Sequence, residues 1–283
     1  MPKSVTVRVP GTTSNLGPGF DCLGIALQMY NFIRVTKSET GIPDAMIEKS
    51  ATSFFKAAKI KAHSFSWDIT GDVPRSRGLG SSVTVRLGIL HALNALNGNT
   101  LSAETLYHLC SALEGHPDNA APAAYGGFTV SRTDFTCQRT AVSGRLSFVL
   151  LIPPFEISTS AARKILPKAV SFKHAVANVG NAALITASFM GKRYETLRDS
   201  FADHLHQPYR KKLLPGLEKI IHAGTQAGAL GGWLSGSGST IACVTLANPQ
   251  KVGAAMLRAS SIKAAEIHIV KADNKGAKIL TRN

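Results

Sequence analysis

A glycine- and serine-rich segment stands directly before a long stretch of helical periodicity. Gly78, Gly80, Ser81 and Ser82 precede apolar residues that recur at helical spacing as far as Leu96. Glycine lets the backbone bend tightly and approach a ligand closely. A bend of this kind at the start of a helix aims several free N–H groups at one point, which favours an anion. The segment therefore predicts an anion site, and its two serine hydroxyls suit phosphate or a hard cation.

The spacing of this segment differs from the two common nucleotide-binding glycine motifs. No Lys-Ser/Thr pair follows the glycines, and no third glycine arrives in the register of the dinucleotide fingerprint. The start of a helix still favours negative charge because the helix dipole is positive there. From these residues alone, phosphate binding and an ordinary glycine–serine turn both remain open.

A second polar cluster lies in the segment ALEGHPDNAAPAAYGGF, residues 112–128. Glu114 is expected at the C-terminal end of a helix, where the dipole disfavours a carboxylate. A magnesium ion is one candidate reason for its position. His116, Asp118 and Asn119 follow in a loop that also contains two prolines. A frayed, solvated helix end and a plain turn are the alternatives for this cluster.

Strands and helices alternate along the chain and must position these residues. Expected strands are Ser4–Pro10, 31–38, 63–74, 145–155, two strands flanking a glycine turn within 228–246, and 265–272. Expected helices are 45–60, Ser82–Leu96, Ser102–Gly115, 158–167, His174–Met190, Tyr194–Leu205, Gly216–Ala223 and 252–260. Thr12–Gly24 is expected as a turn-rich loop.

Two consecutive prolines, Pro153 and Pro154, interrupt the strand pattern in the middle of the chain. Proline cannot donate to a strand ladder, so we expect the strand to end there. We place a domain boundary at this point, between residues 1–153 and 154–283. The mixture of strands and helices on both sides predicts an α+β chain of two lobes.

The composition is that of a globular protein. Of the 283 residues, 44% are hydrophobic and 17% are charged. No apolar run approaches the roughly 20 residues needed to cross a bilayer, and the first residues lack the apolar core of a signal peptide. The cysteines are scattered without paired spacing, which favours a reducing cytoplasm over a disulfide framework or a zinc site: Cys22, Cys110, Cys137 and Cys243.

The net charge of +15 lies mainly in the second half of the chain. Residues 1–150 hold 14 basic and 10 acidic residues, whereas residues 151–283 hold 18 basic and 7 acidic ones. A basic half can meet nucleic acid. No arginine-rich run or RNA-binding signature is present, however, so we favour a cationic surface that attracts anionic small molecules.

Several segments together resemble homoserine kinases of the GHMP small-molecule kinase superfamily. The resemblance is carried by PGTTSNLGPGFDCLGIAL, PRSRGLGSSV, EGHPDNAAPAAYGGF and LSGSGSTI, and it continues through PPFEISTSAARKILPKAV and DHLHQPYRKKLLPG. These segments cover nearly the whole chain in the order of the family. The resemblance implies a ribosomal-S5-domain-2-like N-terminal lobe that binds ATP and a ferredoxin-like C-terminal lobe.

The family transfers the γ-phosphoryl group of ATP to the hydroxyl of L-homoserine, which yields O-phospho-L-homoserine and ADP on the route to threonine. The resemblance implies that Ser82 and Glu114 hold Mg²⁺. It also implies that the glycine segment cradles the phosphates of ATP, with support from Arg77. The ATP-binding residues implied are Pro74, Arg75, Ser76, Arg77, Gly78, Leu79, Gly80, Ser81, Ser82, Val83 and Thr84.

Homoserine carries a carboxylate, an ammonium group and a hydroxyl, so its site needs three unlike partners. By resemblance, Arg163 and Arg210 take the carboxylate, because a guanidinium offers a paired fork of donors. Asp21 takes the ammonium group with Asn15 nearby. The residues implied next to the reacting hydroxyl, and therefore catalytic, are His116 and Asn119. We name no general base, because a loose transition state needs little help from one.

Three positions depart from the usual family pattern. Val83 and Thr84 stand where small residues are usual, and Ser239 stands where proline is common. The segment near the adenine, DAMIEKSATSFF, also differs, so we predict no adenine contacts. The alternatives to a homoserine kinase are a GHMP kinase of another small alcohol and a non-catalytic, basic nucleotide- or RNA-binding module. We expect the chain to form a homodimer.

Overall fold

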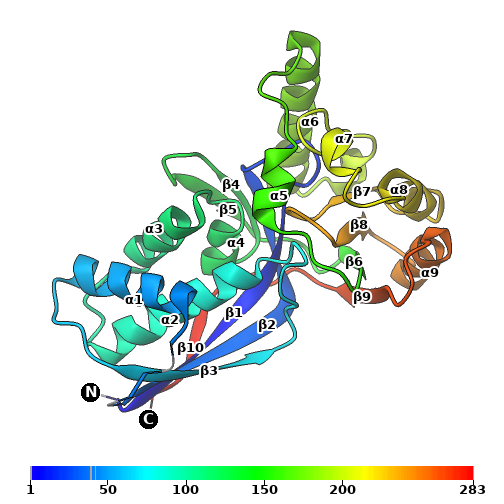
Figure 1. Cartoon of the computed structure of the whole chain (residues 1–283). Coiled ribbons are helices and arrows are strands. Elements are labelled where there is room, and N and C mark those ends of the chain that lie inside the picture. The colour runs from blue at the N-terminus through cyan, green and yellow to red at the C-terminus, as the bar shows by residue number, and fades with distance from the viewer. Residues whose placement is uncertain (1, 39, 42, 283) are drawn as a thin grey trace.

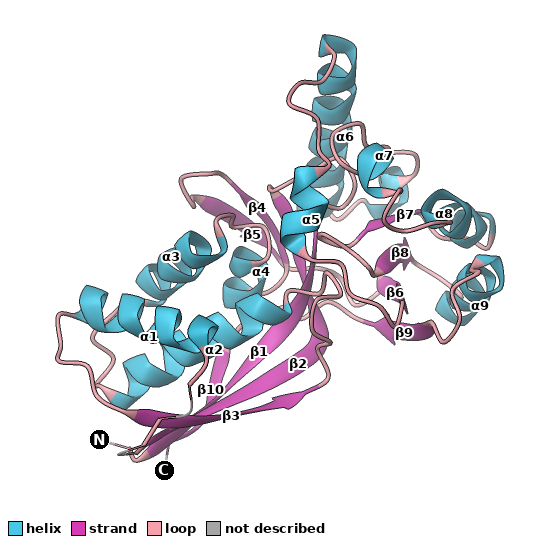
Figure 2. Ribbon diagram, in the orientation of Figure 1, coloured by secondary structure: helices cyan, strands magenta, loops and turns pink. Residues whose placement is uncertain are grey.

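The computed structural model describes residues 2–38, 40–41 and 43–282, and it shows two β-sheets that meet in the middle of the molecule (Figure 1). Helices cover one face of the larger sheet, and further helices cover the outer side of the smaller sheet (Figure 2). This is the two-lobed α+β arrangement that the sequence predicts.

The larger sheet is antiparallel, with the strand order β10–β1–β2–β4–β5 and with β3 also paired to β2. Its first strand alternates as predicted, because Val5, Val7 and Val9 are all fully buried beneath the helices. The strands are β1 Ser4–Ser14, β2 Leu23–Lys37, β3 Phe65–Gly71, β4 Phe128–Ser131, β5 Cys137–Thr140 and β10 Lys278–Arg282.

Four helices lie on this sheet, and α2 is the central one. It is apolar on most of its circumference because it lies between the sheet and the other helices. The side chains of Asp44 and Ser102 cap α1 and α3 by accepting backbone N–H bonds. The helices are α1 Ala45–Ala58, α2 Ser81–Leu96, α3 Ala103–Glu114 and α4 Ala120–Tyr125.

The smaller sheet is a four-stranded antiparallel sheet with the order β7–β8–β6–β9. Two helices, α8 and α9, pack against one of its faces through a separate apolar cluster. The elements are β6 Ser147–Ile152, β7 Gly231–Leu234, β8 Ile241–Thr245, β9 Glu266–Val270, α8 Leu217–Gln226 and α9 Pro249–Ala259.

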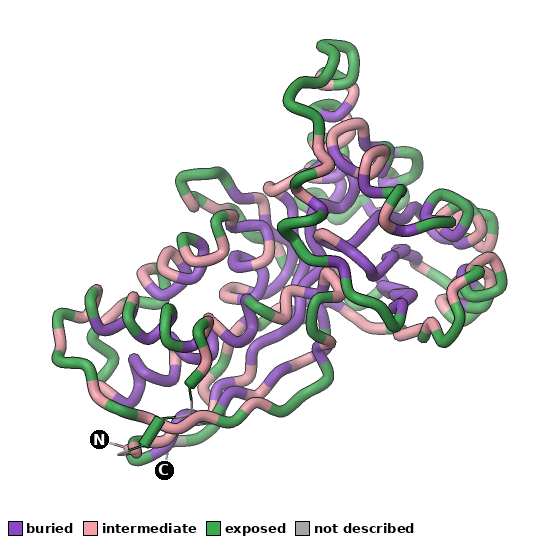
Figure 3. The backbone as a smooth tube through the Cα atoms, in the orientation of Figure 1, coloured by how far each residue is buried: buried purple, intermediate pink, exposed green. Residues whose placement is uncertain are grey.

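Strand β6 is buried on both faces and joins the two lobes. Val149 and Leu151 face the helices of the smaller sheet, whereas Phe148 and Leu150 belong to a cluster shared with the larger sheet. That shared cluster also contains Ile25 of β2. Figure 3 shows the buried backbone concentrated where the sheets meet. The two lobes therefore share one apolar core, which holds the site between them in place.

The division between the sheets does not coincide with the predicted boundary at 153/154. Strand β6 precedes that boundary but pairs with β8 and β9, and β10 follows it but pairs with β1. A strand buried on both faces has no alternation to show which sheet it joins. Strand β10 has only two apolar residues, Ile279 and Leu280, and because they are adjacent they show no strand alternation.

The remaining helices lie between β6 and β7 in the sequence. The N-terminal end of α6 projects from the rest of the molecule (Figure 1). These helices are α5 Thr159–Lys164, α6 Phe172–Met190, the 3₁₀ helix η1 Tyr194–Leu197 and α7 Gln207–Arg210. The helix expected over 194–205 is limited to η1. The Asp203 carboxylate instead accepts hydrogen bonds from the N–H groups of Leu205, His206 and Gln207, which hold a turn before α7. None of the described helices is long and apolar enough to span a membrane.

Candidate functional site

A cavity of about 280 Å³ lies between the lobes and contains most of the sequence-predicted site residues. This volume is close to the lower end of ordinary small-molecule sites. Its walls come from the β1–β2 loop, α1, β3, the glycine segment, the loop after α3, α5 and α7. The predicted site residues that line it are Asn15, Asp21, Arg75, Ser76, Gly78, Gly80, Ser81, Ser82, Val83, Glu114, His116, Asn119, Arg163 and Arg210.

Two glycines of the glycine segment are required by the space around them. Gly78 and Gly80 have φ angles of 71° and 68°, in the left-handed region that side chains disfavour. A Cβ on Gly78 would overlap the carbonyl oxygen of Ser235, and one on Gly80 would overlap the hydroxyl of Thr12. The segment is therefore wedged between the two lobes, with its backbone exposed to the cavity.

Helix α2 begins without a side-chain cap. Gly80 is its N-cap and offers no capping group. Among the described residues, the N–H groups of Ser81, Ser82 and Val83 have no acceptor. Free N–H groups and the helix dipole together favour an anion at this end of α2. The unusual Thr84 fits here, because its hydroxyl donates to the Ser81 carbonyl oxygen at 2.7 Å.

The two residues expected to hold a metal ion lie side by side. The Ser82 hydroxyl donates to Glu114 Oε2 at 2.9 Å, and Arg86 Nε donates to Glu114 Oε1 at 2.6 Å. A hydroxyl and a carboxylate are the hard oxygen ligands that Mg²⁺ prefers, so this donor set suits that ion. The Arg86 guanidinium compensates the carboxylate charge, and its Nη1 is buried without a hydrogen-bond partner in the described part of the chain.

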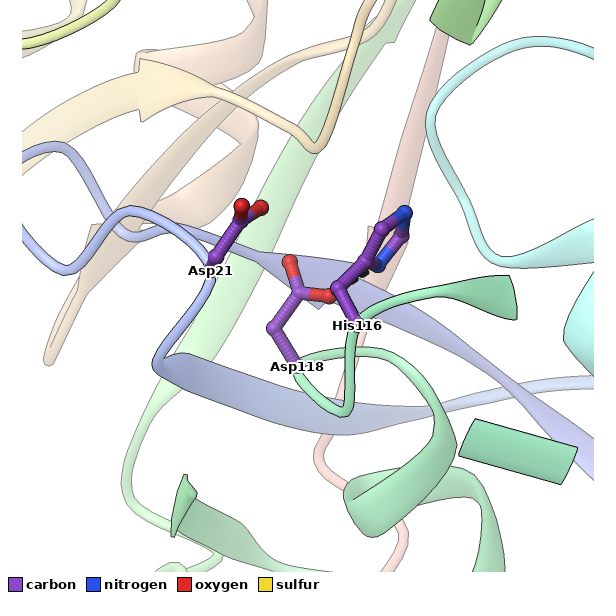
Figure 4. A group of neighbouring side chains, drawn as sticks. All are labelled: Asp21, His116 and Asp118. Atoms are coloured by element: carbon purple, nitrogen blue, oxygen red, sulfur yellow. Dashed lines mark hydrogen bonds and ion pairs between the residues drawn. The ribbon is translucent and has the colours of Figure 1, made fainter. Parts of the chain in front are cut away.

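His116 and Asp118 form a hydrogen-bonded pair at the floor of the cavity. His116 Nδ1 lies 2.8 Å from Asp118 Oδ1 (Figure 4). Burial disfavours the imidazolium, but the hydrogen bond and charge of Asp118 outweigh it and raise the pKa of His116 above 6.5. Burial likewise opposes ionisation of Asp118, yet its interaction with His116 lowers the pKa of Asp118. Each partner therefore stabilises the charged form of the other.

Asn119 connects this loop to the end of β1. Its Oδ1 accepts from the Thr12 hydroxyl at 2.7 Å, and its Nδ2 donates to the Ser14 hydroxyl at 2.9 Å. Thr12 is the residue that a side chain at Gly80 would strike. The amide of Asn119 thus fixes the end of β1 next to the glycine segment.

Asp21 and Arg163 form a two-pronged ion pair across the cavity. Arg163 Nη1 and Nη2 donate to the two carboxylate oxygens at 2.9 and 2.7 Å. Burial lowers the pKa of Arg163, but the hydrogen bond and charge of Asp21 more than compensate and raise it. Asn15 orients the aspartate, because its Oδ1 accepts the Asp21 N–H at 3.0 Å. Asp21, His116 and Asp118 place ligand atoms within 4.8 Å of one another (Figure 4), but each already has a partner within the protein.

Arg210 lies at the other side of the same space and is buried. Its guanidinium donates to the carbonyl oxygens of Ala162 and Gly236 at 3.1 and 3.0 Å. Burial and the nearby charge of Arg163 lower the pKa of Arg210 to about 10, so it remains a cation at neutral pH. One cavity therefore combines an uncapped helix N-terminus, a carboxylate–hydroxyl pair and two guanidinium groups.

The chain is similar to known proteins along nearly its whole length. The model of the GHMP kinases N terminal domain matches residues 45–127, and that of the GHMP kinases C terminal matches residues 185–262. A homoserine kinase from Clostridium beijerinckii is 40% identical over 98% of each chain. One from Caldicellulosiruptor bescii is 37% identical over 98% of this chain and 97% of its own.

The chain belongs to the homoserine kinase family of the GHMP kinases. The crystal structure of homoserine kinase from Cytophaga hutchinsonii has a TM-score of 0.90 and 28% identity, over 99% of this chain and 98% of that one. Family membership makes the chain a phosphotransferase with ATP as its co-substrate, as the sequence predicts.

Four residues implied by the family resemblance as ATP-binding do not line the cavity: Pro74, Arg77, Leu79 and Thr84. Arg77 donates instead to the carbonyl oxygens of Pro153 and Pro154 at 3.0 and 2.6 Å, which ties the glycine segment to the chain after β6. Leu79 is buried in the shared core. Arg77 and Leu79 therefore support the glycine segment on the side away from the cavity.

Sequence reasoning missed the apolar end of the cavity. It is lined by residues of α1, β3 and the first turns of α2: Met46, Ile47, Trp67, Ile69, Val83 and Val85. Only Val83 was implied by the resemblance. The others occupy ordinary amphipathic positions, so their spacing alone does not distinguish a ligand wall from core.

Proposed function

We propose that this cavity binds ATP and L-homoserine together and that the chain transfers the γ-phosphoryl group to the homoserine hydroxyl. One observation carries the proposal. The free N–H groups at the start of α2 and the Asp21–Arg163 pair with Arg210 all line the same cavity. The first suits a polyphosphate, and the second suits a small amino acid with both charges.

The cavity also suggests the direction in which ATP lies. We place its phosphates against Gly78, Gly80 and the N-terminus of α2. The adenine then occupies the apolar end between Met46 and Trp67. This orientation points the terminal phosphate toward the homoserine end, because the glycine segment lies between the two.

Magnesium completes the nucleotide site in this proposal. Ser82 and Glu114 would hold it, and the ion would neutralise charge on the phosphate oxygens. Glu114 is already compensated by Arg86 at 2.6 Å, so the nucleotide must supply most of the negative charge that attracts the ion. Arg86 therefore favours a metal that arrives bound to ATP.

For homoserine, we assign the carboxylate to Arg163 and Arg210, and the ammonium group to Asp21 with Asn15 beside it. The carboxylate enters a region where two guanidinium groups lie near the ring of Phe20, at 5.5 and 5.1 Å from its centroid. The remaining group of the substrate, the hydroxyl, then faces His116 and Asn119.

Transfer of this phosphoryl group depends mainly on alignment and charge stabilisation. We assign His116 and Asn119 to directing the hydroxyl, and we name no general base. In a loose transition state, the bond to the leaving oxygen is largely broken before the attacking oxygen needs to lose its proton. The family's place in threonine biosynthesis follows from this reaction.

The decisive experiment is release of ADP by the purified chain with MgATP and L-homoserine. We expect turnover with homoserine and much less with serine, mevalonate and simple diols. Preference for another alcohol would instead assign a different GHMP kinase activity. Absence of turnover together with RNA binding that weakens steeply with salt would support the basic binding module.

The cytoplasm and a homodimer complete the proposal. All four cysteines are free thiols, which supports a reducing compartment. Size-exclusion chromatography with light scattering tests the assembly, and a monomer at micromolar concentration would contradict the dimer.

A further inference from the structure

The buried guanidinium of Arg210 is held by an imidazole that none of the preceding assignments uses. Arg210 Nη1 lies 3.3 Å from His206 Nδ1, one turn earlier in the chain. Arg210 Nε and Nη1 also donate to the carbonyl oxygens of Ala162 and Gly236, respectively. Among the described residues, Arg210 Nη2 has no hydrogen-bond partner, and Arg210 lines the cavity. The contacts therefore orient the guanidinium and leave one nitrogen for a ligand.

The contact with Arg210 determines the tautomer of His206. A guanidinium donates hydrogen bonds and cannot accept them, so His206 Nδ1 must carry the lone pair. The ring proton then lies on Nε2, which donates to the carbonyl oxygen of Gly17 at 2.9 Å. The ring of Phe20 stacks on the imidazole, with centroids 5.1 Å apart. His206 is fully buried, so its orientation is firmly determined.

The charged groups around His206 are Asp203, Arg210 and, further away, Asp21. Asp203 Oδ2 lies 3.4 Å from Nε2, but the same oxygen accepts the N–H groups of His206 and Gln207. Burial lowers the pKa of His206 most, Arg210 lowers it further, and the carboxylates oppose both. The net pKa is below 6.5, so the ring is neutral at neutral pH.

We propose that His206 is a positioning residue for the substrate carboxylate. The lone pair on Nδ1 of its neutral imidazole holds the Arg210 guanidinium toward the cavity. The inference rests on the proposed binding of that carboxylate by Arg210. A neutral acceptor orients a guanidinium without cancelling its charge. Arg163 differs, because its charge is shared with Asp21. Arg210 therefore keeps its full charge for the substrate.

Two substitutions separate the two ring nitrogens. In His206→Asn, the amide oxygen lies as many bonds from Cα as Nδ1 does, so it can still accept from Arg210. In His206→Gln, the amide reaches the position of Nε2, which retains a donor to Gly17 and loses the acceptor for Arg210. We expect KM for homoserine to change less than about threefold in His206→Asn and to rise about ten- to hundredfold in His206→Gln, since a charge-assisted hydrogen bond is at stake. KM for ATP and kcat stay within about threefold in both.

A substrate without the carboxylate distinguishes positioning from general loosening. 3-Amino-1-propanol is homoserine without its carboxylate. In His206→Gln, the preference for homoserine over this amino alcohol should fall by the same factor by which KM rises. An equal loss for both substrates would overturn the proposal. Arg210→Met separates it from the proposed function, because an unchanged preference in that variant would remove the carboxylate assignment itself.

Nitrogen-15 NMR of the histidine rings tests the inference without turnover. The neutral Nε2–H form of His206 should persist below pH 6.5, and Arg210→Met should raise the pKa of His206 by removing a neighbouring cation. An Nδ1–H tautomer, or a His206 that is protonated at neutral pH, would overturn the proposal. A further sign is a KM for homoserine that rises on acidification in the wild type and not in His206→Asn.

Discussion

Asp21 and Arg163 lie 142 residues apart in the sequence, and their side chains meet in a two-pronged ion pair with N–O distances of 2.9 and 2.7 Å. Both are partly exposed to the cavity, at 29% and 36% of their side-chain surfaces. We assign them to opposite charges of the same substrate. Binding of homoserine therefore replaces one ion pair with two. Before it binds, Asp21 and Arg163 neutralise each other, so neither is an unpaired charge in the cavity. A ligand with only one of the two charges gains less from this exchange.

Asp21→Asn tests this exchange. Asp21 has a φ of 55°, and asparagine tolerates that region, so the backbone should be retained. We expect KM for homoserine to rise about tenfold or more, because the ammonium group loses a charged partner. The freed Arg163 should then favour 4-hydroxybutanoate, which lacks the ammonium group, relative to homoserine. Steady-state kinetics with both substrates measure the ratio, and an equal loss for both would contradict the assignment.

Gly80→Ala should damage both stability and the nucleotide site. The new Cβ would strike Thr12, whose hydroxyl holds Asn119, and φ is 68°. We expect the free energy of unfolding to fall by about 1–3 kcal/mol and KM for ATP to rise about tenfold or more. Gly98→Ala is the matched control, because Gly98 has a φ of 85° with no atom within 4 Å of its Cβ position. In Gly98→Ala, denaturant melts should show a loss of stability from backbone strain, whereas KM for ATP should stay unchanged. A similar rise in KM in this control would refute the explanation.

Features determined by a few neighbouring residues were predictable from the sequence. Helix α3 begins after Ser102 and ends before Gly115, at the two expected caps, because a cap is a contact within one turn. The glycine segment precedes α2 for the same local reason. The resemblance added long-range information, and it associated Asp21, Arg163 and Arg210 before any distance was known.

Contacts set by the packing of distant segments were not predictable. Arg75 and Arg77 look alike in the sequence, yet Arg75 lines the cavity and Arg77 turns back to Pro153 and Pro154. The sequence likewise gave no sign that β6 joins the smaller sheet, since burial on both faces removes its alternation. The bond from Arg86 to Glu114 was missed for a related reason: the side chains come from two helices, and no local spacing brings them together.

The Arg86–Glu114 pair predicts how the metal affinity of the free protein changes. Arg86→Met leaves the Glu114 charge uncompensated, so Mn²⁺ should bind the nucleotide-free chain about tenfold more tightly or better. Arg86→Lys keeps the charge and should resemble the wild type. Electron paramagnetic resonance of free Mn²⁺ measures the binding, and thermal melts confirm that each variant is folded. Equal affinities in the Met and Lys variants would show that the charge of Arg86 does not control this site.

The His116–Asp118 pair predicts a pH dependence of stability. The pKa of His116 is raised by folding, so its contribution is complete below pH 6.5 and disappears as the pH rises through the folded pKa. The pKa of Asp118 is lowered, so its contribution is complete above pH 3.8 and disappears as the pH falls through the folded pKa. The pair therefore stabilises the chain most between these two ordinary values.

Asp118→Asn removes that charge pair and should cost most stability in mildly acidic solution. Each unit by which the folded pKa of His116 exceeds 6.5 corresponds to about 1.4 kcal/mol, so the difference in unfolding free energy from the wild type should shrink by that amount between about pH 5.5 and about pH 9. Urea melts at both values measure it. Asp134→Asn is the control, because Asp134 pairs with Arg132 at the surface and no histidine takes part. If the difference in unfolding free energy between Asp118→Asn and the wild type stays constant or grows as the pH rises, Asp118 does not raise the pKa of His116.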